Sequence, residues 1–170
     1  IGLSYENFKD VYFSQGISLN YDDLTTDETA STLLQNQSGS ATDLMLDYSL
    51  STDKRDRRFM PTNGYLTSFF QEFPIYADQP FIKNSFSSSH YNEFSENVVG
   101  ALKFSVTSIN GLNDEDVRVS QRLTLSTKKL RGFQAGKIGP KDGSDFVGGN
   151  YSSSLNLEAN FPNFFPEKSN

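Results

Sequence analysis

Apolar and polar residues alternate along several long segments of the chain, and this period of two limits the fold more than any other feature. In the segment 102–107, three apolar side chains alternate with Lys, Ser and Thr. Successive side chains of a β-strand point to opposite faces of a sheet, so the pattern predicts a strand with one apolar and one polar face. The segments 44–50 and 155–161 follow the same pattern. The chain is therefore predicted to be all-β.

Two kinds of connection join the predicted strands. Short connections at 61–64 and 93–97 are rich in turn residues, whereas long loops run from about 9 to 41 and from about 111 to 148. Strands that are joined by short turns pair antiparallel, so we expect an antiparallel meander of about six strands.

The two long loops carry weaker signals of their own. The segment 23–37 predicts a short helix with Thr25 or Thr26 as its N-cap. In the second loop, residues 117–125 alternate enough to form a further short strand.

Composition excludes several classes of function. The chain has 15 Lys and Arg against 21 Asp and Glu, and its net charge of -6 argues against a nucleic-acid partner. It has no cysteine and one histidine, which excludes thiol nucleophiles and clusters of zinc ligands. The sequence has no Gly-x-Ser-x-Gly motif and no phosphate-binding glycine loop. We therefore expect no enzymatic activity, no cofactor and no metal site.

The length of the predicted strands favours a membrane protein. They run to roughly 10–14 residues, longer than the ~5–6 that are usual in soluble proteins. Long alternating strands, joined alternately by short turns and long loops, are typical of a transmembrane β-barrel whose apolar face meets lipid and whose polar face lines the lumen. A soluble antiparallel β-sandwich also alternates, and the pattern alone leaves it open.

Two motifs indicate a family. The first is Leu130-Arg131-Gly132-Phe133, followed by Ile138-Gly139-Pro140 and by Gly148-Gly149-Asn150. The second is Asp53-Lys54-Arg55-Asp56, followed by Pro61-Thr62-Asn63-Gly64-Tyr65. In this order and strand context they resemble the bacterial surface-antigen barrel of the BamA-type outer-membrane β-barrel assembly factors. In that family the first motif belongs to an extracellular loop that folds back into the lumen, and the second to a periplasmic turn.

The resemblance implies that residues 1–170 are a partial surface-antigen domain, the C-terminal barrel fragment of a sixteen-stranded transmembrane barrel. The POTRA domains and the terminal strands are then absent. In the family, the first and last strands form the lateral gate. Residues 1–8 become the end of the seventh strand. The eighth to twelfth strands are expected at 41–53, 63–76, 81–93, 98–110 and 149–161.

The resemblance also implies a function. A protein of this kind lies in the outer membrane of Gram-negative bacteria, and it folds and inserts other β-barrel proteins without a chemical step. Its expected partners are outer-membrane lipid, unfolded β-barrel client proteins and accessory assembly lipoproteins, with no nucleic acid. One alternative is a two-partner secretion-type transport pore of the same superfamily, which also carries an Arg-Gly-Tyr/Phe loop. A weaker alternative is a soluble β-sandwich adhesin.

Arg131 is the main candidate functional residue, in a lumen latch formed by residues 130–133. A guanidinium in a lumen needs an acidic or carbonyl partner, because a buried charge without one is costly. Glu158 lies on the polar face of its predicted strand, and the matching carboxylate contacts this arginine in the family. The alternative is an ordinary exposed loop arginine.

The other site residues have supporting roles. Phe133 is expected to anchor the loop by packing. Gly139 and Pro140 should form a turn, and Gly148 and Gly149 should let the loop return to the sheet. In the second motif, the charged residues are interpreted as a solvated turn with local ion pairs, formed by Asp53, Arg55 and Asp56 and closed by Pro61, Thr62, Gly64 and Tyr65.

Overall fold

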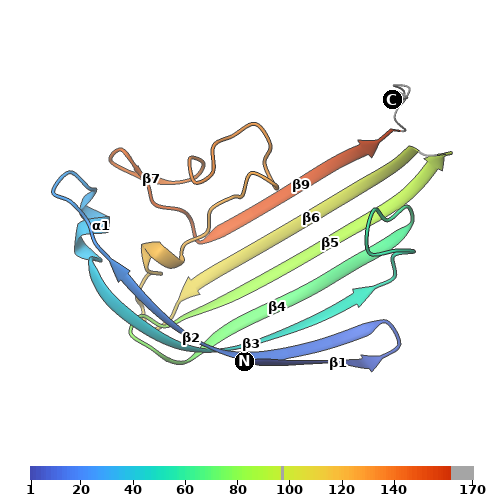
Figure 1. Cartoon of the computed structure of the whole chain (residues 1–170). Coiled ribbons are helices and arrows are strands. Elements are labelled where there is room, and N and C mark those ends of the chain that lie inside the picture. The colour runs from blue at the N-terminus through green and yellow to red at the C-terminus, as the bar shows by residue number, and fades with distance from the viewer. Residues whose placement is uncertain (97, 162–170) are drawn as a thin grey trace, which may run out of the picture.

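A computed structural model describes residues 1–96 and 98–161 of the chain, and within them seven strands form one antiparallel sheet in sequence order, β1-β2-β3-β4-β5-β6-β9. Figure 1 shows the sheet curving into an open trough that is not closed into a barrel. The strands are β1 (Gly2–Phe8), β2 (Val11–Leu24), β3 (Gly39–Asp53), β4 (Gly64–Ala77), β5 (Phe81–Ser95), β6 (Val98–Gly111) and β9 (Tyr151–Asn160).

Four shorter elements lie in the connections. The first long connection holds α1 (Thr32–Asn36), and the second holds a 3-10 turn (Val119–Gln121), β7 (Lys141–Asp142) and β8 (Asp145–Phe146). In the described part of the chain, no helix is long and apolar enough to cross a membrane.

The pairing register keeps apolar and polar side chains on opposite faces of the sheet. One row of directly opposed residues crosses six strands and is entirely apolar or aromatic: Tyr5, Phe13, Leu50, Phe69, Phe86 and Val106. The neighbouring row meets Tyr12 on β2 and consists of serines on the strands from β3 to β9: Ser51, Ser68, Ser87, Ser105 and Ser154. Hydrogen bonds of 2.9 and 2.8 Å join Ser68 to Ser87 and Ser105 to Ser154. The alternation predicted from sequence therefore holds along these rows, although Ser153 of β9 lies opposite Val106 on the outer face.

The outward face matches the prediction made for β6 and β9. Leu102 pairs with Leu157, and Phe104 pairs with Leu155, so these side chains share one face with Val106. All five are exposed, as is Phe161 just beyond β9. A continuous exposed apolar surface is what a lipid-facing barrel wall requires, and monomeric soluble proteins rarely carry one.

A small hydrophobic core lies on the opposite, otherwise polar face. Met45 of β3, Phe81 of β5 and Ile109 of β6 pack with Val117 of the second long connection, and each is at most 3% exposed. Leu123 packs against this cluster. The connection between β6 and β9 is therefore rooted on the inner face by apolar burial.

The prediction of a loop over 9–41 is wrong for residues 11–24, which form the 14-residue strand β2. Phe13, Ile17 and Leu19 of β2 point to the apolar face, but Gln15 interrupts the alternation between them. Because β2 pairs between β1 and β3, the sheet has seven strands where about six were expected. Counted back from β9 as the twelfth strand, β2 takes the seventh place, and residues 1–8 form the strand before it.

Three further predictions need correction. The short helix exists, but it begins after Ser31 as N-cap rather than at Thr25 or Thr26. Residues 117–125 do not form a strand, because they contain the 3-10 turn and a single bridge from Leu123 to Gly149. The sandwich is also wrong, since the second sheet among the described residues is only the two-stranded hairpin of β7 and β8. Asn97 of the predicted turn and residues 162–170 of the predicted domain lie outside the described residues.

Ile109→Ala should lower the free energy of unfolding of the intact protein by about 2–5 kcal/mol, because it leaves a cavity in the core that roots the loop. Val106→Ala on the same strand is the matched control, since Val106 is 39% exposed on the outer face and encloses no cavity. Urea unfolding of both variants in the same lipid measures the difference, and equal losses would contradict a core on the inner face.

Candidate functional site

The connection between β6 and β9 runs back along the polar face of the sheet. It leaves β6 at Gly111 and enters β9 at Tyr151, yet its Arg131 contacts Glu158, which pairs with Ala101 near the start of β6. Ten residues of β6 separate Ala101 from Gly111, which is about 33 Å at ~3.3 Å per residue. The loop therefore reaches down most of the length of the trough.

At the tip of this loop Arg131 Nη2 donates a hydrogen bond to Glu158 Oε1 at 3.2 Å. The side chain of Arg131 is 75% exposed, whereas that of Glu158 is 18% exposed. A second contact holds the same segment, in which Asn156 Nδ2 donates to the carbonyl oxygen of Lys129 at 2.9 Å. The structure thus brings Arg131 and Glu158 together, through an interaction that is open to solvent.

Lys103 is a further partner of Glu158 that the sequence reasoning did not single out. Its Nζ donates to Glu158 Oε2 at 2.7 Å, a shorter contact than that of Arg131. Lys103 lies on β6 diagonally across from Glu158, because its direct partner on β9 is Asn156. The position of Lys103 on the polar face was visible in the sequence, but the register that brings it to Glu158 was not.

The three charged groups line a polar cavity of about 550 Å³ between the loop and the sheet. Two further cations, Lys128 and Lys129, lie on its loop side, and serine hydroxyls of β5, β6 and β9 line its floor. Cations outnumber carboxylates here, so the cavity is electropositive although the chain carries a net charge of -6. Among the described residues, no group of His, Asp and Glu is arranged to hold a metal ion.

The remaining loop residues lie as follows. Leu130 is half-buried, but Phe133 is 56% exposed, so the expectation that it anchors the loop by packing is wrong. The anchor is Val117, which the apolar core encloses. Positive φ angles occur at three of the predicted turn and return positions: Gly132 (86°), Gly139 (126°) and Gly148 (72°).

The loop returns to the sheet at Gly148 and Gly149. Leu123 and Gly149 exchange two backbone hydrogen bonds of 2.8 and 3.0 Å, which close the base of the loop. A Cβ at Gly148 would press on the carbonyl oxygen of Leu123, and its φ is in the left-handed region, so glycine is required there. Pro140 lies beside Gly149 and accepts a hydrogen bond from Val147 N at 3.1 Å.

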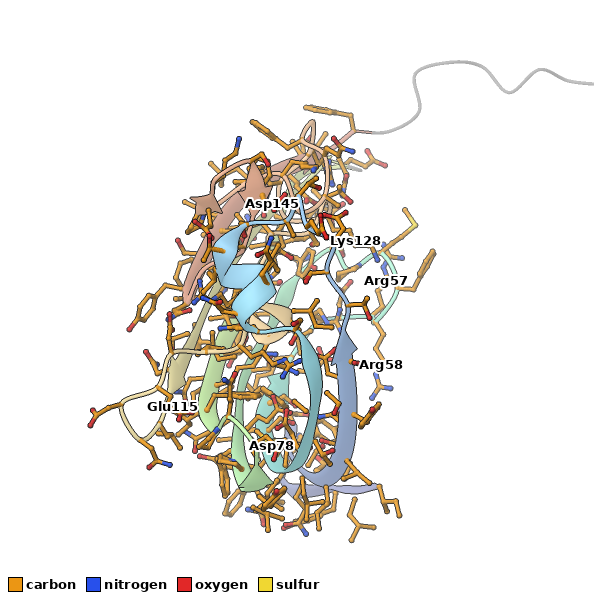
Figure 2. All side chains as sticks on the ribbon, turned by 90° about the vertical axis from the view of Figure 1, so that its left-hand side faces the viewer. Arg57, Arg58, Asp78, Glu115, Lys128 and Asp145 are labelled. Carbon is orange, nitrogen blue, oxygen red and sulfur yellow. The ribbon has the colours of Figure 1, made fainter. Side chains whose placement is uncertain are left out.

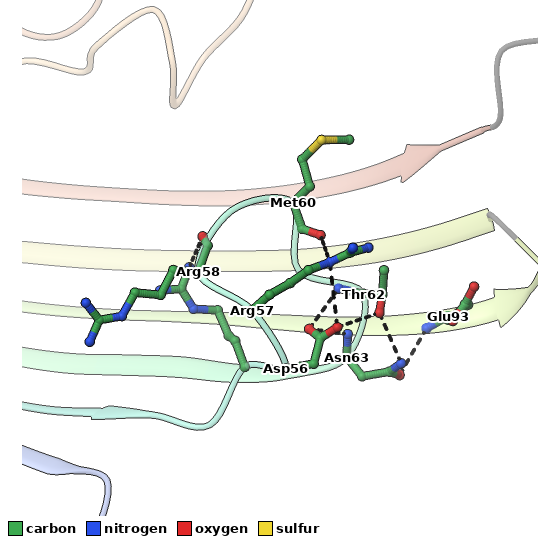
Figure 3. Close-up of polar contacts among 8 residues, drawn as sticks. Asp56, Arg57, Arg58, Met60, Thr62, Asn63 and Glu93 are labelled. Carbon is green, nitrogen blue, oxygen red and sulfur yellow. Dashed lines mark hydrogen bonds and ion pairs between the residues drawn. The ribbon is translucent and has the colours of Figure 1, made fainter.

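The second motif forms the turn between β3 and β4. Arg55 donates two hydrogen bonds of 2.8 Å to the carboxylate of Asp53, in the bidentate geometry that only arginine offers. Asp56 accepts hydrogen bonds from the backbone and hydroxyl of Thr62 at 2.9 and 2.7 Å, and from Asn63 N at 3.1 Å (Figure 3). The turn is therefore held by its own carboxylates.

The turn also connects to its surroundings. Asn63 Oδ1 accepts a hydrogen bond from Glu93 N at 3.3 Å, which links it to the end of β5 (Figure 3). Gly64 has φ +96°, and a Cβ there would overlap the carbonyl oxygen of Lys54, so this position also requires glycine. Pro61 is half-buried in the turn, and Tyr65 stacks on His90 with ring centroids 5.5 Å apart.

The fold and the loop together define a class of protein. Among the described residues, a curved antiparallel sheet has an apolar outer face and a loop that folds along its polar inner face, which is the arrangement of a β-barrel wall. A family model for the Omp85 superfamily domain matches residues 2–170, and the chain belongs to this superfamily of outer-membrane proteins.

Two curated proteins resemble the chain. It is 28% identical over 142 residues to a SAM50-like protein of Schizosaccharomyces pombe, a match that covers 79% of this chain and 30% of that protein. It is 29% identical over 154 residues to the outer membrane protein assembly factor BamA of Neorickettsia risticii, covering 88% of this chain and 21% of that protein. The chain thus spans less than a third of either relative. Neither name points to secretion, so the secretion alternative is not favoured.

A solved structure shares the fold. The crystal structure of BamA from Haemophilus ducreyi lacking POTRA domains 1–3 superposes with a TM-score of 0.84 at 20% sequence identity. The match covers 98% of this chain and 37% of that one. The trough therefore has the fold of part of that BamA structure.

The turn motif predicts a specific pH dependence. Hydrogen bonds from the Thr62 hydroxyl and from the backbone of Asn63 and Thr62 hold the pKa of Asp56 at about 2, below its ordinary value of 3.8. Because the folded pKa is the lower one, Asp56 stabilises the fold above about pH 4, and this contribution is lost as the pH falls towards about 2. Asp56→Asn should therefore flatten the fall in the urea midpoint between these pH values. Asp114→Asn in the exposed loop should follow the wild-type curve.

Lys103 should couple to Glu158 more strongly than Arg131 does. A double-mutant cycle with Lys103→Met and Glu158→Gln should give a coupling of about 1 kcal/mol, whereas Arg131→Met with Glu158→Gln should give at most a few tenths, because solvent screens the exposed arginine. Urea unfolding of the intact protein measures both cycles. A coupling energy larger for Arg131 than for Lys103 would contradict the solvent-exposed contact between Arg131 and Glu158.

Proposed function

We propose that the chain is the far wall and inner latch of a BamA-type factor that folds and inserts β-barrel proteins into the bacterial outer membrane. The names of the two relatives support assembly, since one is called an outer membrane protein assembly factor and the other SAM50-like. The observation that carries the proposal is the contact of Arg131 with Glu158 deep in the trough. It gives the loop a defined docked position on the lumen wall.

The function needs no chemical step from this part of the protein. Its outer face offers Leu, Phe and Val side chains to lipid, and its inner face offers serines and a few charges. We propose a non-enzymatic role without a cofactor, in which the wall holds the barrel in lipid while unfolded β-barrel clients are assembled elsewhere on the same barrel. Accessory assembly lipoproteins are proposed as further partners on the strength of the family resemblance.

The energetics of the latch suit a reversible contact. An exposed ion pair contributes about 0–1 kcal/mol, so Arg131 can leave Glu158 at little cost. When Arg131 leaves, Glu158 still forms its ion pair with Lys103, so the charge of the carboxylate is not left unpaired in the lumen. We propose that the loop tip is held loosely enough to move while its root stays in the apolar core.

Arg131→Ala in the full-length protein should lower the assembly of other outer-membrane β-barrels severalfold, while the variant itself still folds in the membrane. Arg131→Lys should recover part of the activity, because it keeps the charge but loses the planar fork. Lys128→Ala removes a cation from the same exposed loop segment and is the matched control. The amounts of folded client porins in the outer membrane are measured. Normal assembly with Arg131→Ala would exclude a functional role for the latch.

A further inference from the structure

We propose that Arg118 is a positioning residue that ties the root of the Arg131 loop across the trough to β2 and β3, and thereby sets where the tip can dock. The inference rests on the proposed function of the latch. Arg118 follows β6 by a few residues, but its contacts lie on strands that are separated from β6 in the sheet by β4 and β5. The loop therefore has a holding point on each side of the trough.

The side chain of Arg118 is buried, and its partner Asp22 is half-buried. Arg118 is 8% exposed, its Nη2 donates to the carbonyl oxygen of Gly39 at the start of β3, and its Nε lies 3.3 Å from Asp22 Oδ2 on β2. Both Nε and Oδ2 are buried without a hydrogen-bond partner, so each is compensated only by the charge of the other in the ion pair. A buried charge that loses its partner is strongly destabilising, which makes this contact hard to release.

The surroundings of Arg118 favour a cation at this place. Asp22 pairs with Arg118 directly, and Asp43 interacts electrostatically with Arg118 as well as with Asp22 and Asp78. Asp78 also accepts a hydrogen bond from Thr42 N at 2.8 Å, so it holds the same end of β3. An arginine can face a carboxylate and donate to a carbonyl at the same time, which a lysine does less well. Arg118 thus neutralises acids from two parts of the sheet and binds the backbone between them.

The neighbours of Arg118 strengthen the same attachment. Val117 is 1% exposed in the apolar core, and Val119 N donates to Gln37 Oε1 at 2.6 Å. Three consecutive residues therefore contact the sheet or the segment that precedes β3. The contrast with Arg131, whose side chain is 75% exposed, separates a fixed root from a loosely held tip.

A second pair of contacts joins the far part of the loop to the same side of the trough. Asp145 accepts a hydrogen bond from Ser31 N at 2.8 Å, and Asp142 accepts one from Leu33 N at 3.0 Å, so the β7–β8 hairpin holds the start of α1. Figure 2 shows Asp145 next to α1. The hairpin contacts the connection between β2 and β3, and Arg118 contacts the two strands that this connection joins. The root of the loop is therefore attached to both sides of the trough, and Arg118 is the buried residue in this attachment.

The test uses the full-length protein with a disulfide that reports tip docking while Arg131 and Glu158 are kept, and every variant compared lacks the Asn156 hydrogen bond to Lys129 equally. Residues 1–170 contain no cysteine, so Lys129→Cys and Asn156→Cys can be introduced at the 2.9 Å contact beside Arg131. In this background Arg118→Asp should slow formation of the 129–156 disulfide about tenfold, the change expected when a buried partner is lost. The charge swap Asp22→Arg with Arg118→Asp should recover most of the rate. Lys9→Asp, an equal charge reversal at an exposed turn, should leave it unchanged.

Each outcome decides the proposal. Wild-type cross-linking with Arg118→Asp, or a failure of the charge swap to recover the rate in a folded barrel, would overturn it. Folding is followed by the heat-dependent mobility of the barrel in detergent gels, and Arg118→Gln, which removes only the charge, replaces Arg118→Asp if the latter does not fold. If cross-linking responds as expected but client assembly does not, Arg118 positions the loop and the proposed function of the latch is the part that fails.

Discussion

The register of the strands is the constraint on which the rest of the structure depends. Each strand pairs with its neighbour over nine to fourteen consecutive positions between β2 and β9 apart from isolated bulges, and a slip of one residue would move every side chain to the other face. The register aligns the apolar row through Phe69 and Phe86 on one face and the serine row through Ser87 and Ser105 on the other. Because most of the apolar side chains are on one face, that face can meet lipid while the other accepts a polar loop.

The inner face is not uniform, and its two ends act differently on the loop. Near the junction of β6 with the loop, Val117 is enclosed by apolar side chains and Arg118 by acids, so the root is held by desolvated contacts. Near Glu158 the face is open, and Arg131 competes there with Lys103 for one carboxylate. A desolvated contact is costly to break and a solvated ion pair is not, so the same loop combines a fixed attachment with a releasable one. This division is the basis of the proposal that the loop tip moves while its root stays fixed.

Sequence reasoning recovered the strands whose alternation is clean and missed the one where it is not. Residues 102–107 alternate without exception, whereas in β2 Gln15 lies on the apolar face, and this weaker pattern predicts a loop instead of a strand. For the site, the polar-face position of Glu158 together with the family resemblance was enough to expect its contact with Arg131. Lys103 and Arg118 were not found, because their partners come from strands or loops whose register and path a single sequence does not record.

The sequence by itself therefore determined the class of the fold, the two faces of the sheet and the family. Alternation, turn residues and motifs are formed by residues that are close together in the chain, so they can be recognised without the tertiary structure. Only the tertiary structure decided that Phe133 is exposed while Val117 anchors the loop, that Glu158 is shared between two cations, and that Arg118 reaches β2 and β3. These contacts depend on the curvature of the sheet and on where the loop crosses it. Both are set by the packing of residues that are far apart in the chain, and no local pattern encodes that distance.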